Sequence, residues 1–494
     1  MTFPAWSSFL TGLDPGQHGV FDFTQKVPGR WGIRFTNATD RVGDSLFARV
    51  CGAGGSVLAL GMPATFPPES LEGLLVCGFD APVSTGSDAR SASDPSLYRE
   101  IASRVGPWMR PDLDEGAKAD AWHERAVGTL LDRVDRKTAF ALAALERMAQ
   151  RGRSPDLLCV VFSESDTVAH HYWRDHDPLS PRHDSGASPR RRGAIAAVYE
   201  RLDEACGELR RAFGEAAHCV VVSDHGFGGA SRRVVHLNRR LEECGLLRRA
   251  TAPRVMAPDA LARRARDAAL SLLPPKLAQA AFRRARPAAA RLESAARFGG
   301  FDWAATAAIS EEANTQPGVW IALAGREAQG AVTPADYERV RREVIDSLLD
   351  WKLPDGAPVV ARALPREEVY VGPFVERAPD VVVELALDQG YGLSLVPTPW
   401  AERSQASVRT LGEGELAGGR GRGMNGTHRP DGVFISSHPE LEARSIMDVA
   451  PTLLHAMGIP QVGSDADAPQ AHREYSREEQ QAVAARLRAL GYLE

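Results

Sequence analysis

Apolar strands alternate with helical segments along much of this 494-residue chain. Continuous apolar runs predict buried strands at 157–162, 219–222, 381–385 and 433–436. Apolar residues at three- and four-residue steps predict helices at 115–152, 194–213, 334–351 and 477–490. Strands that are apolar on both faces are typical of a parallel sheet covered by helices. The pattern therefore predicts an α/β fold with a mostly parallel central sheet and helices on both faces.

Other regions interrupt this alternation. Residues 30–115 are expected to be mostly loop with one strand at 56–60, and a polar loop is expected after His170. Residues 250–300 are rich in Ala and Arg, which favours a solvated helical hairpin over a basic face for an anionic surface. We expect three units, namely the first part of the core at 1–240, an inserted cap at 241–370, and the second part of the core at 371–494.

Composition limits the partners and the compartment. The six cysteines are scattered and none stands in a Cys-x-x-Cys motif, which argues against a disulfide framework and a thiolate zinc site and fits a reducing compartment. The net charge of −5 gives no reason to expect a nucleic acid duplex as partner. No run of about 18 apolar residues is present, and no leader sequence. We therefore expect a cytoplasmic protein without a membrane span.

Acidic and imidazole side chains stand at the ends of predicted strands, where sites collect in parallel sheets. The four-residue spacing of Asp166 and His170 puts both on one face of a first helical turn. Asp224 and His225 follow the next strand, and His428 precedes a third. Two carboxylates and three imidazoles suit Zn²⁺ or Mn²⁺, and five donors suggest two ions in one cleft. The alternative for each histidine is a hydrogen-bonded structural role.

The chain opens in dense, motif-like sequence, MTFPAWSSFLTGLDPGQHGVFDF, so we expect it to begin within a domain. Pro4 and the glycine-rich turns frame a short helix expected at 5–11, which puts Thr2 at or just before a helix N-terminus. The free backbone amides there favour an anion or an activated hydroxyl. Thr2 is therefore either a helix cap alone or a reactive hydroxyl.

The chain resembles the type I phosphodiesterase/nucleotide pyrophosphatase family of the alkaline phosphatase superfamily in an ordered set of motifs. These are TFPAW with SFLTGLDPGQHGVFDF, Asp166-x-x-x-His170, SDHG at 223–226, GTH at 426–428, MDVAPTLLHAMGIP, and the terminal ALGYL. By this resemblance Thr2 matches the nucleophile. One metal ion would be held by Asp224 and His225, and the other by Asp166, His170 and His428.

The resemblance implies an alkaline phosphatase-like fold, a small-molecule phosphate ester as substrate, and two divalent cations, of which Zn²⁺ is expected first and Mn²⁺ second. Thr2 would attack phosphorus and expel an alcohol or nucleotide, and water would then cleave the phosphothreonine. Two ions roughly 4 Å apart could clamp the attacking and leaving oxygens of this in-line displacement. Coordination would also lower the pKa of the threonine hydroxyl, which is a poor nucleophile otherwise.

The chain departs from the family pattern at two places. The family has a further aspartate ligand on a strand before the nucleophile, whereas only Met1 precedes Thr2 here. We therefore expect either an upstream in-frame extension or a catalytically impaired, truncated homologue that acts as a metal-stabilised binding protein. Phe23 falls where nucleotide pyrophosphatases have an asparagine that contacts the phosphoryl group, which argues against nucleotide substrates.

Related reaction classes lack their motifs in this chain. The sulfatase string C/S-x-P-x-R is absent, and so is the Asn-Ser-Glu setting of cofactor-independent phosphoglycerate mutases. The choice between phosphate monoesters and diesters stays open, because it depends on extra positive charge in the pocket. Arg30, Arg34 and Arg429 are candidates for that charge, with a surface role as the alternative. We expect the determinants of substrate identity within residues 240–370.

Overall fold

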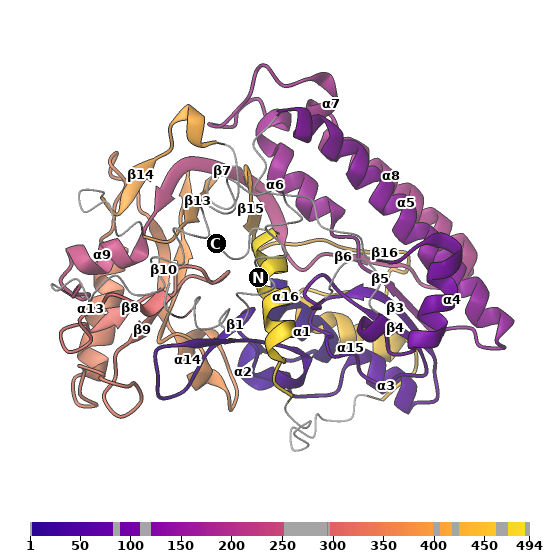
Figure 1. Cartoon of the computed structure of the whole chain (residues 1–494), viewed down its shortest axis with the longest axis horizontal. Helices are drawn as coiled ribbons and strands as arrows, with labels where there is room; N and C mark the ends of the chain where they lie inside the picture. The colour runs from indigo at the N-terminus through magenta and orange to yellow at the C-terminus, as the bar shows by residue number, and fades with distance from the viewer. Residues whose placement is uncertain are drawn as a thin grey trace.

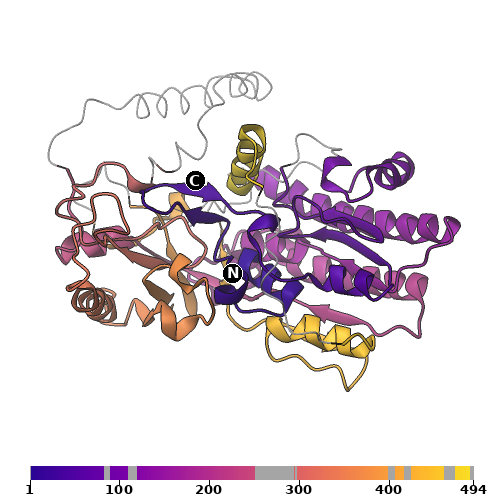
Figure 2. The same cartoon turned by 90° about the horizontal axis from the view of Figure 1, so that it is seen from below.

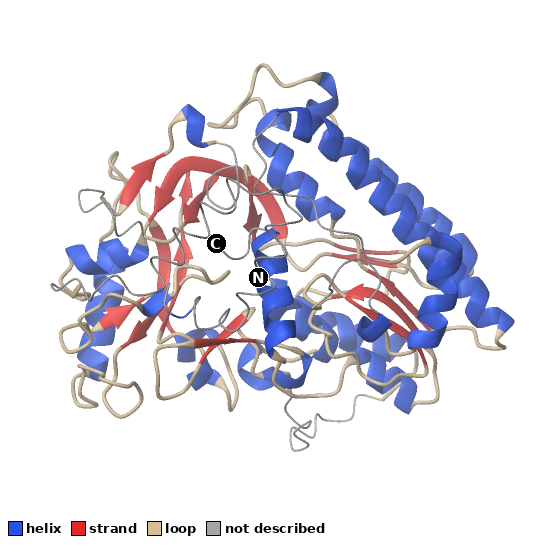
Figure 3. Ribbon diagram, in the orientation of Figure 1, coloured by secondary structure: helices blue, strands red, loops and turns tan. Residues whose placement is uncertain are grey.

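The computed structural model describes residues 2–82, 89–108, 120–250, 294, 297–398, 406–416, 424–460 and 473–489. Several sheets are packed against helices, which confirms the predicted α/β class (Figures 1 and 3). Most of the Ala- and Arg-rich stretch falls outside the described residues, so the helical hairpin expected there stays a prediction. Within the described ranges, no helix combines the length and apolar character that a membrane crossing needs.

A three-stranded parallel sheet in the order β4-β3-β5 carries the first part of the site. The central strand β3 (Val57–Met62) is flanked by β4 (Gly73–Cys77) and β5 (Leu157–Val160). All residues of β3 are buried, because successive side chains point to opposite faces and a helical layer covers each face. The strands predicted at 56–60 and 157–162 are therefore confirmed, with small shifts at their ends.

Helices cover the two faces of this sheet. The core on one face includes α1 (Thr2–Thr11), α3 (Leu46–Gly52), α15 (Ile446–Ala456) and α16 (Arg477–Ala489). The core on the other face includes α4 (Pro95–Val105), α5 (Asp120–Gln150) and α8 (Ala194–Phe213). The long helices α5 and α8 contact each other along the outer edge of the molecule (Figure 1). Helix α8 has the predicted bounds.

A second, mixed sheet is built around the long strand β7 (Gly226–Val235). It pairs in parallel with β13 and antiparallel with β14 and β15. The other strands of this sheet are β12 (Leu387–Asp388), β13 (Tyr391–Leu395), β14 (Val408–Thr410) and β15 (Gly426–Arg429). Strand β6 (Val220–Val222), just before β7 in the chain, pairs antiparallel with β16 (Phe434–Ser436).

A third, antiparallel sheet lies on the far side of the molecule from the parallel sheet (Figure 2). Its strands are β8 (Ala308–Ile309), β9 (Gly318–Ile321), β10 (Val360–Pro365) and β11 (Val381–Leu385). Helices α9 (Leu237–Glu243) and α13 (Tyr337–Leu349) share a core with it. Strand β11 has the predicted bounds, and it pairs with β9 and β10, which lie within the expected cap.

The sheets contain more antiparallel pairs than the sequence pattern predicts. Among the described strands, parallel pairing joins β3 to β4 and β5, and β7 to β13. Neighbouring strands such as β12 and β13 are joined by a tight turn, and such short connections permit antiparallel pairing only. Other short elements include α2 (Pro15–His18), β1 (Thr24–Lys26), β2 (Ile33–Phe35), α7 (Pro189–Arg192) and α14 (Arg366–Val369).

Two loop predictions are wrong in part. Besides the predicted strand, the segment at 30–115 contains β2, α3, β4 and α4; β2, α3 and β4 are short elements with little periodic signal, whereas α4 is an amphipathic helix that was missed. The polar loop expected after His170, at 174–192, is shorter than predicted, because helix α6 (Glu164–His176) includes its first three residues and α7 its last four. Its polar residues include Arg174 and Asp175, which are ion-paired with neighbouring segments, so a polar sequence here covers a packed helix.

Candidate metal centre

Helix α6 carries the first two predicted ligands. Strand β5 ends at Val160, and α6 begins at Glu164, so Asp166 lies in the first turn and His170 one turn later. The Nε2 atom of His170 lies 3.5 Å from Oδ1 of Asp166. The spacing prediction is therefore correct, since residues four apart share a face of the helix.

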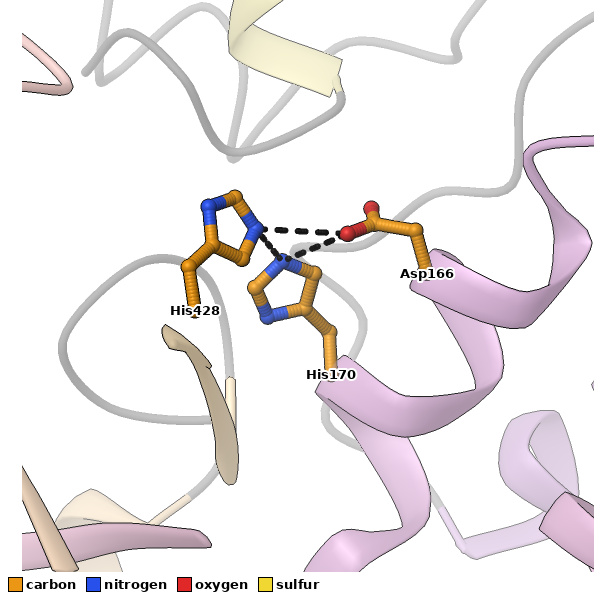
Figure 4. A group of neighbouring side chains, drawn as sticks. All are labelled: Asp166, His170 and His428. Carbon is orange, nitrogen blue, oxygen red and sulfur yellow. Dashed lines mark hydrogen bonds and ion pairs between the residues drawn. The ribbon is translucent and has the colours of Figure 1, made fainter. Parts of the chain in front are cut away.

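Strand β15 brings His428 to the same point. Its Nε2 atom lies 3.2 Å from Oδ1 of Asp166 and 3.1 Å from Nε2 of His170. Figure 4 shows the three side chains converging from α6 and from the opposite strand, and their ligand atoms all lie within 4.8 Å of one another. His428 precedes strand β16, as predicted, and it also lies within a strand of its own, β15, opposite Phe227 of β7.

The second predicted pair, Asp224 and His225, follows strand β6 and adjoins this group. Nε2 of His225 lies 3.5 Å from Oδ2 of Asp224 and 3.8 Å from Oδ1 of Asp166. The rings of His225 and His428 are stacked, with centroids 3.6 Å apart. All five predicted donors therefore gather in one place, and Asp166 faces all three imidazoles.

Backbone carbonyls orient two of the rings. Nδ1 of His170 lies 2.9 Å from the carbonyl oxygen of Gly426, and Nδ1 of His225 lies 3.1 Å from that of Gly226. A carbonyl oxygen only accepts hydrogen bonds, so the proton of each neutral ring belongs on Nδ1. Each Nε2 atom then offers a lone pair to the centre, which is the arrangement of a metal-binding histidine.

Burial and charge set the protonation states of these residues. Burial acts to raise the pKa of Asp166, but the three imidazoles outweigh it and hold this pKa well below its usual range. Burial lowers the pKa of His428 to about 3, partly opposed by the Asp166 carboxylate, so the ring is neutral at pH 7. Burial, together with the charge of Asp166, raises the pKa of Asp224, and His225 opposes this rise.

Three buried oxygens of the predicted site have no hydrogen-bond partner among the described residues. They are Oδ1 of Asp166, Oδ2 of Asp224 and Oγ1 of Thr2. A buried carboxylate oxygen without a donor is costly, and a divalent cation would satisfy it. The donor set of two carboxylates and three imidazoles therefore fits Zn²⁺ or Mn²⁺.

Thr2 is the first residue of α1, as the sequence predicts for a helix N-terminus, and it is buried. The helix begins three residues earlier than expected. Pro4 is compatible with this start, because the amides of a first helical turn have no partner within the helix. The described contacts bring the five ligand residues together, and they leave the Thr2 hydroxyl buried and unpartnered.

The other predicted residues take different roles. Phe23 is buried against Phe3, with ring centroids 5.1 Å apart, so it extends the apolar core beside Thr2. Arg429 follows His428 in β15 and therefore faces the opposite side of the strand. Its Nη2 atom donates to the carbonyl oxygens of Gly229 and Gly390 at 3.2 and 3.0 Å. Arg34 is paired with Asp40 at 2.6 Å, and Arg30 is exposed.

Two features of the site were not predicted from the sequence. Phe227 packs its ring 4.7 Å from that of His170 and 5.4 Å from that of His428, and it forms an apolar wall under both. Gly226 permits the backbone at Asp431 to approach closely, because a Cβ atom at position 226 would lie 1.9 Å from the carbonyl oxygen of Asp431. The glycine-rich run GFGG, directly after Asp224 and His225, was the signal that could have revealed this approach.

Comparison with known proteins gives one family match. The family model described as "Type I phosphodiesterase / nucleotide pyrophosphatase" matches residues 1–393. Among curated proteins no match is found. Among solved structures, murine ectonucleotide pyrophosphatase / phosphodiesterase 5 is 13% identical, with a TM-score of 0.41 over 94% of this chain and 86% of that chain. The human protein of that name is 12% identical, with a TM-score of 0.43 over 94% of this chain and 85% of that chain.

Proposed function

Because this chain belongs to the type I phosphodiesterase/nucleotide pyrophosphatase family of hydrolases, we propose that it hydrolyses a small-molecule phosphate ester with Thr2 as the nucleophile. The observation that supports the proposal is the convergence of five carboxylate and imidazole side chains from α6, β15 and the residues after β6. These ligands would be Asp166, His170, Asp224, His225 and His428.

The proposed centre holds two divalent cations, with Zn²⁺ as the first expectation and Mn²⁺ as the second. When bound, such ions lower the pKa of a coordinated hydroxyl and withdraw charge from phosphoryl oxygens. Asp166 is suited to hold a cation because its carboxylate is ionised and faces three imidazoles. The neutral ring of His428 offers its lone pair throughout the neutral range.

The reaction then proceeds in two displacements. Oγ1 of Thr2 would attack phosphorus while its proton passes to the ester oxygen, which leaves as an alcohol when its bond to phosphorus breaks. Water would then attack the phosphothreonine: its hydroxyl goes to phosphorus, its second proton goes to Oγ1 of Thr2 as the P–Oγ1 bond breaks, and the phosphate product is released. The buried, unpartnered hydroxyl of Thr2 supports this role, because neither a donor nor an acceptor in the described protein competes for it.

The apolar surroundings of the nucleophile bear on the substrate. Phe3, the residue after Thr2, forms a buried aromatic pair with Phe23, and neither ring can donate a hydrogen bond to a phosphoryl oxygen. By resemblance, an asparagine amide would do so in nucleotide pyrophosphatases. We therefore propose a phosphate ester other than a nucleotide as the preferred substrate.

The geometry also favours a second candidate, a metal-stabilised binding protein with one cation. Within the described residues, the group whose ligand atoms lie within 4.8 Å of one another contains three members, Asp166, His170 and His428. A second cation would rely on Asp224, His225 and the hydroxyl of Thr2. Metal analysis of the purified protein separates the candidates, since the hydrolase requires two bound ions per chain and the binding protein holds one.

Thr2→Ala tests the hydrolase directly, with bis-p-nitrophenyl phosphate as substrate and added Zn²⁺ or Mn²⁺. Loss of the nucleophile should lower kcat by at least about 10³-fold. Thr11→Ala is the matched control, because Thr11 is buried in the same helix and its hydroxyl is satisfied by the carbonyl oxygen of Ser7 at 2.8 Å. Equal rates for Thr2→Ala and the unaltered protein would reject Thr2 as the nucleophile.

A further inference from the structure

A buried lysine lies beneath the start of helix α6. Nζ of Lys137, in the middle of α5, lies 2.9 Å from Oε2 of Glu164, and the two side chains are 13% and 2% exposed. The same ammonium lies 3.4 Å from the carbonyl oxygen of Val161 and 3.4 Å from Oγ of Ser163. The ammonium therefore contacts Val161 and Ser163 in the connection between β5 and α6, and Glu164 at the start of α6.

The first turn of α6 lacks the usual support. Ser163 is its N-cap residue, but the side chain of Ser163 makes no capping hydrogen bond to the helix. Such caps normally satisfy the free amides of the first turn and fix where a helix starts. Lys137 cannot accept hydrogen bonds from those amides, but its contacts with the side chains of Ser163 and Glu164 hold the first turn in place.

The surroundings make this contact strong. The rings of Trp108 and Phe162 lie near the ammonium, with centroids 5.8 and 5.9 Å from Nζ. A charge pair in such an apolar setting interacts more strongly than one in water. As a source of net stability, however, a buried pair is weak, because both charges lose their hydration. The main effect of the pair is then on the position of the first turn of α6, since removal of either partner leaves the other charge buried without its counter-charge.

We propose that Lys137 is a positioning residue for the metal centre, which it reaches through Glu164. Side chains two positions apart point to opposite sides of a helix, so Glu164 faces α5 while Asp166 faces the cluster. By fixing Glu164, Lys137 sets the rotation and the height of the first turn of α6. This sets where Asp166 and His170 meet His428. The proposal rests on the function proposed above.

The test compares two buried Lys–Glu pairs of this chain. Lys137→Met breaks the pair under α6. Lys26→Met is the matched control, because Lys26 is paired with Glu327 and both side chains are buried, but this pair lies in the region of β1 and Trp320. Mn²⁺ affinity is measured by calorimetry, and amide hydrogen exchange of α6 is measured in metal-free protein.

Lys137→Met should weaken Mn²⁺ binding by about 10–100-fold, as is typical when a partner behind the ligands is lost. It should also speed amide exchange in the first turn of α6. Lys26→Met should lower the melting temperature without changing either quantity. If Lys137→Met lowers the melting temperature but leaves Mn²⁺ affinity and α6 exchange unchanged, Lys137 is only a structural residue and the proposal is overturned.

Two further variants keep the test decisive. Glu164→Gln preserves the shape of the side chain and keeps an acceptor for Lys137, so it should fold and should weaken Mn²⁺ binding less than Lys137→Met. The double variant Lys137→Met/Glu164→Met should regain thermal stability but not Mn²⁺ affinity; recovery of both overturns the positioning role. If the unaltered protein binds no Mn²⁺, the proposed function fails, and the exchange rates of α6 alone decide the role of Lys137.

Discussion

The Nε2 atoms of His170 and His428 lie 3.1 Å apart, although 258 residues separate the two in sequence. The carbonyl oxygen of Gly426 assigns the proton of neutral His170 to Nδ1. Its Nε2 lone pair therefore faces the second imidazole and the carboxylate of Asp166, 3.5 Å away. Several acceptors that converge in this way are stabilised by a cation at their centre.

Removal of one ring of this pair should release the cation. His428→Ala should weaken Zn²⁺ binding by at least about 100-fold, because the cation loses one of its ligand atoms and the alanine side chain offers none in its place. Calorimetric titration of the purified protein measures this. His438→Ala serves as control, since His438 lies after β16 and its ring packs on His218, with centroids 4.6 Å apart. Unchanged affinity in His428→Ala would remove β15 from the metal centre.

A small substitution at the crossing after β6 should disturb the same site. Gly226→Ala would put a Cβ atom 1.9 Å from the carbonyl oxygen of Asp431, so the backbone has to move. We expect a loss of about 1–3 kcal/mol in the free energy of unfolding, measured with urea, and weaker Zn²⁺ binding. Gly414→Ala is the control, because nothing lies within 4 Å of a Cβ atom there. Equal behaviour of the two variants would contradict this explanation.

The free energy of unfolding should decrease as the pH rises, because Glu312 loses its proton. Burial raises the pKa of this carboxyl from 4.5 to about 7, even though Asn238 and Thr398 donate hydrogen bonds to it. The folded state therefore binds the proton more tightly than the unfolded state. This contribution is complete below the unfolded pKa of 4.5 and is lost as the pH rises through about 7.

Glu312→Gln should remove that dependence. Urea unfolding at several pH values from 4 to 8 would show a flatter dependence of the free energy of unfolding on pH in the variant. The variant is also expected to be less stable than the unaltered protein at low pH. Its amide NH₂ would face the backbone N–H of Thr398, which donates to Oε2 of Glu312 in the unaltered protein. Identical slopes for the two proteins would assign the pH dependence to other groups.

Two cysteines are placed for cross-linking. The Sγ atoms of Cys206 in α8 and Cys219 before β6 lie 3.8 Å apart, 13 residues distant in sequence. In oxidised glutathione, each chain should lose two thiols and two hydrogen atoms, and two molecules of reduced glutathione should form. The cross-link should stabilise the protein by about 3 kcal/mol, the value for a loop of about 15 residues.

Mass spectrometry of the oxidised protein identifies the bridged peptides, and thermal unfolding reports the gain in stability. Cys206→Ser should abolish both effects. Cys51→Ser should leave both unchanged, because Cys51 lies in α3 at the opposite face of the parallel sheet. A mixed disulfide with glutathione at Cys219, without an internal bridge, would contradict the prediction.

Local pattern was sufficient for several parts of this protein. The pair Asp166 and His170 could be placed on one helical face, because spacing along a helix depends only on the chain itself. The bounds of α8 followed from apolar periodicity, and those of β11 followed from a continuous apolar run, for the same reason. Short elements such as α3 and β4 were missed, because seven or five residues carry too little periodic signal.

Sequence by itself determined the donor types, their order along the chain, and the α/β class, since these depend on residue chemistry and on periodicity. Tertiary structure decided that His428 lies inside β15 opposite Phe227, that Arg429 faces away, and that Lys137 lies under α6. These relationships depend on strand register and on helix packing between distant segments. Many registers suit one apolar pattern, and only the assembled core selects among them.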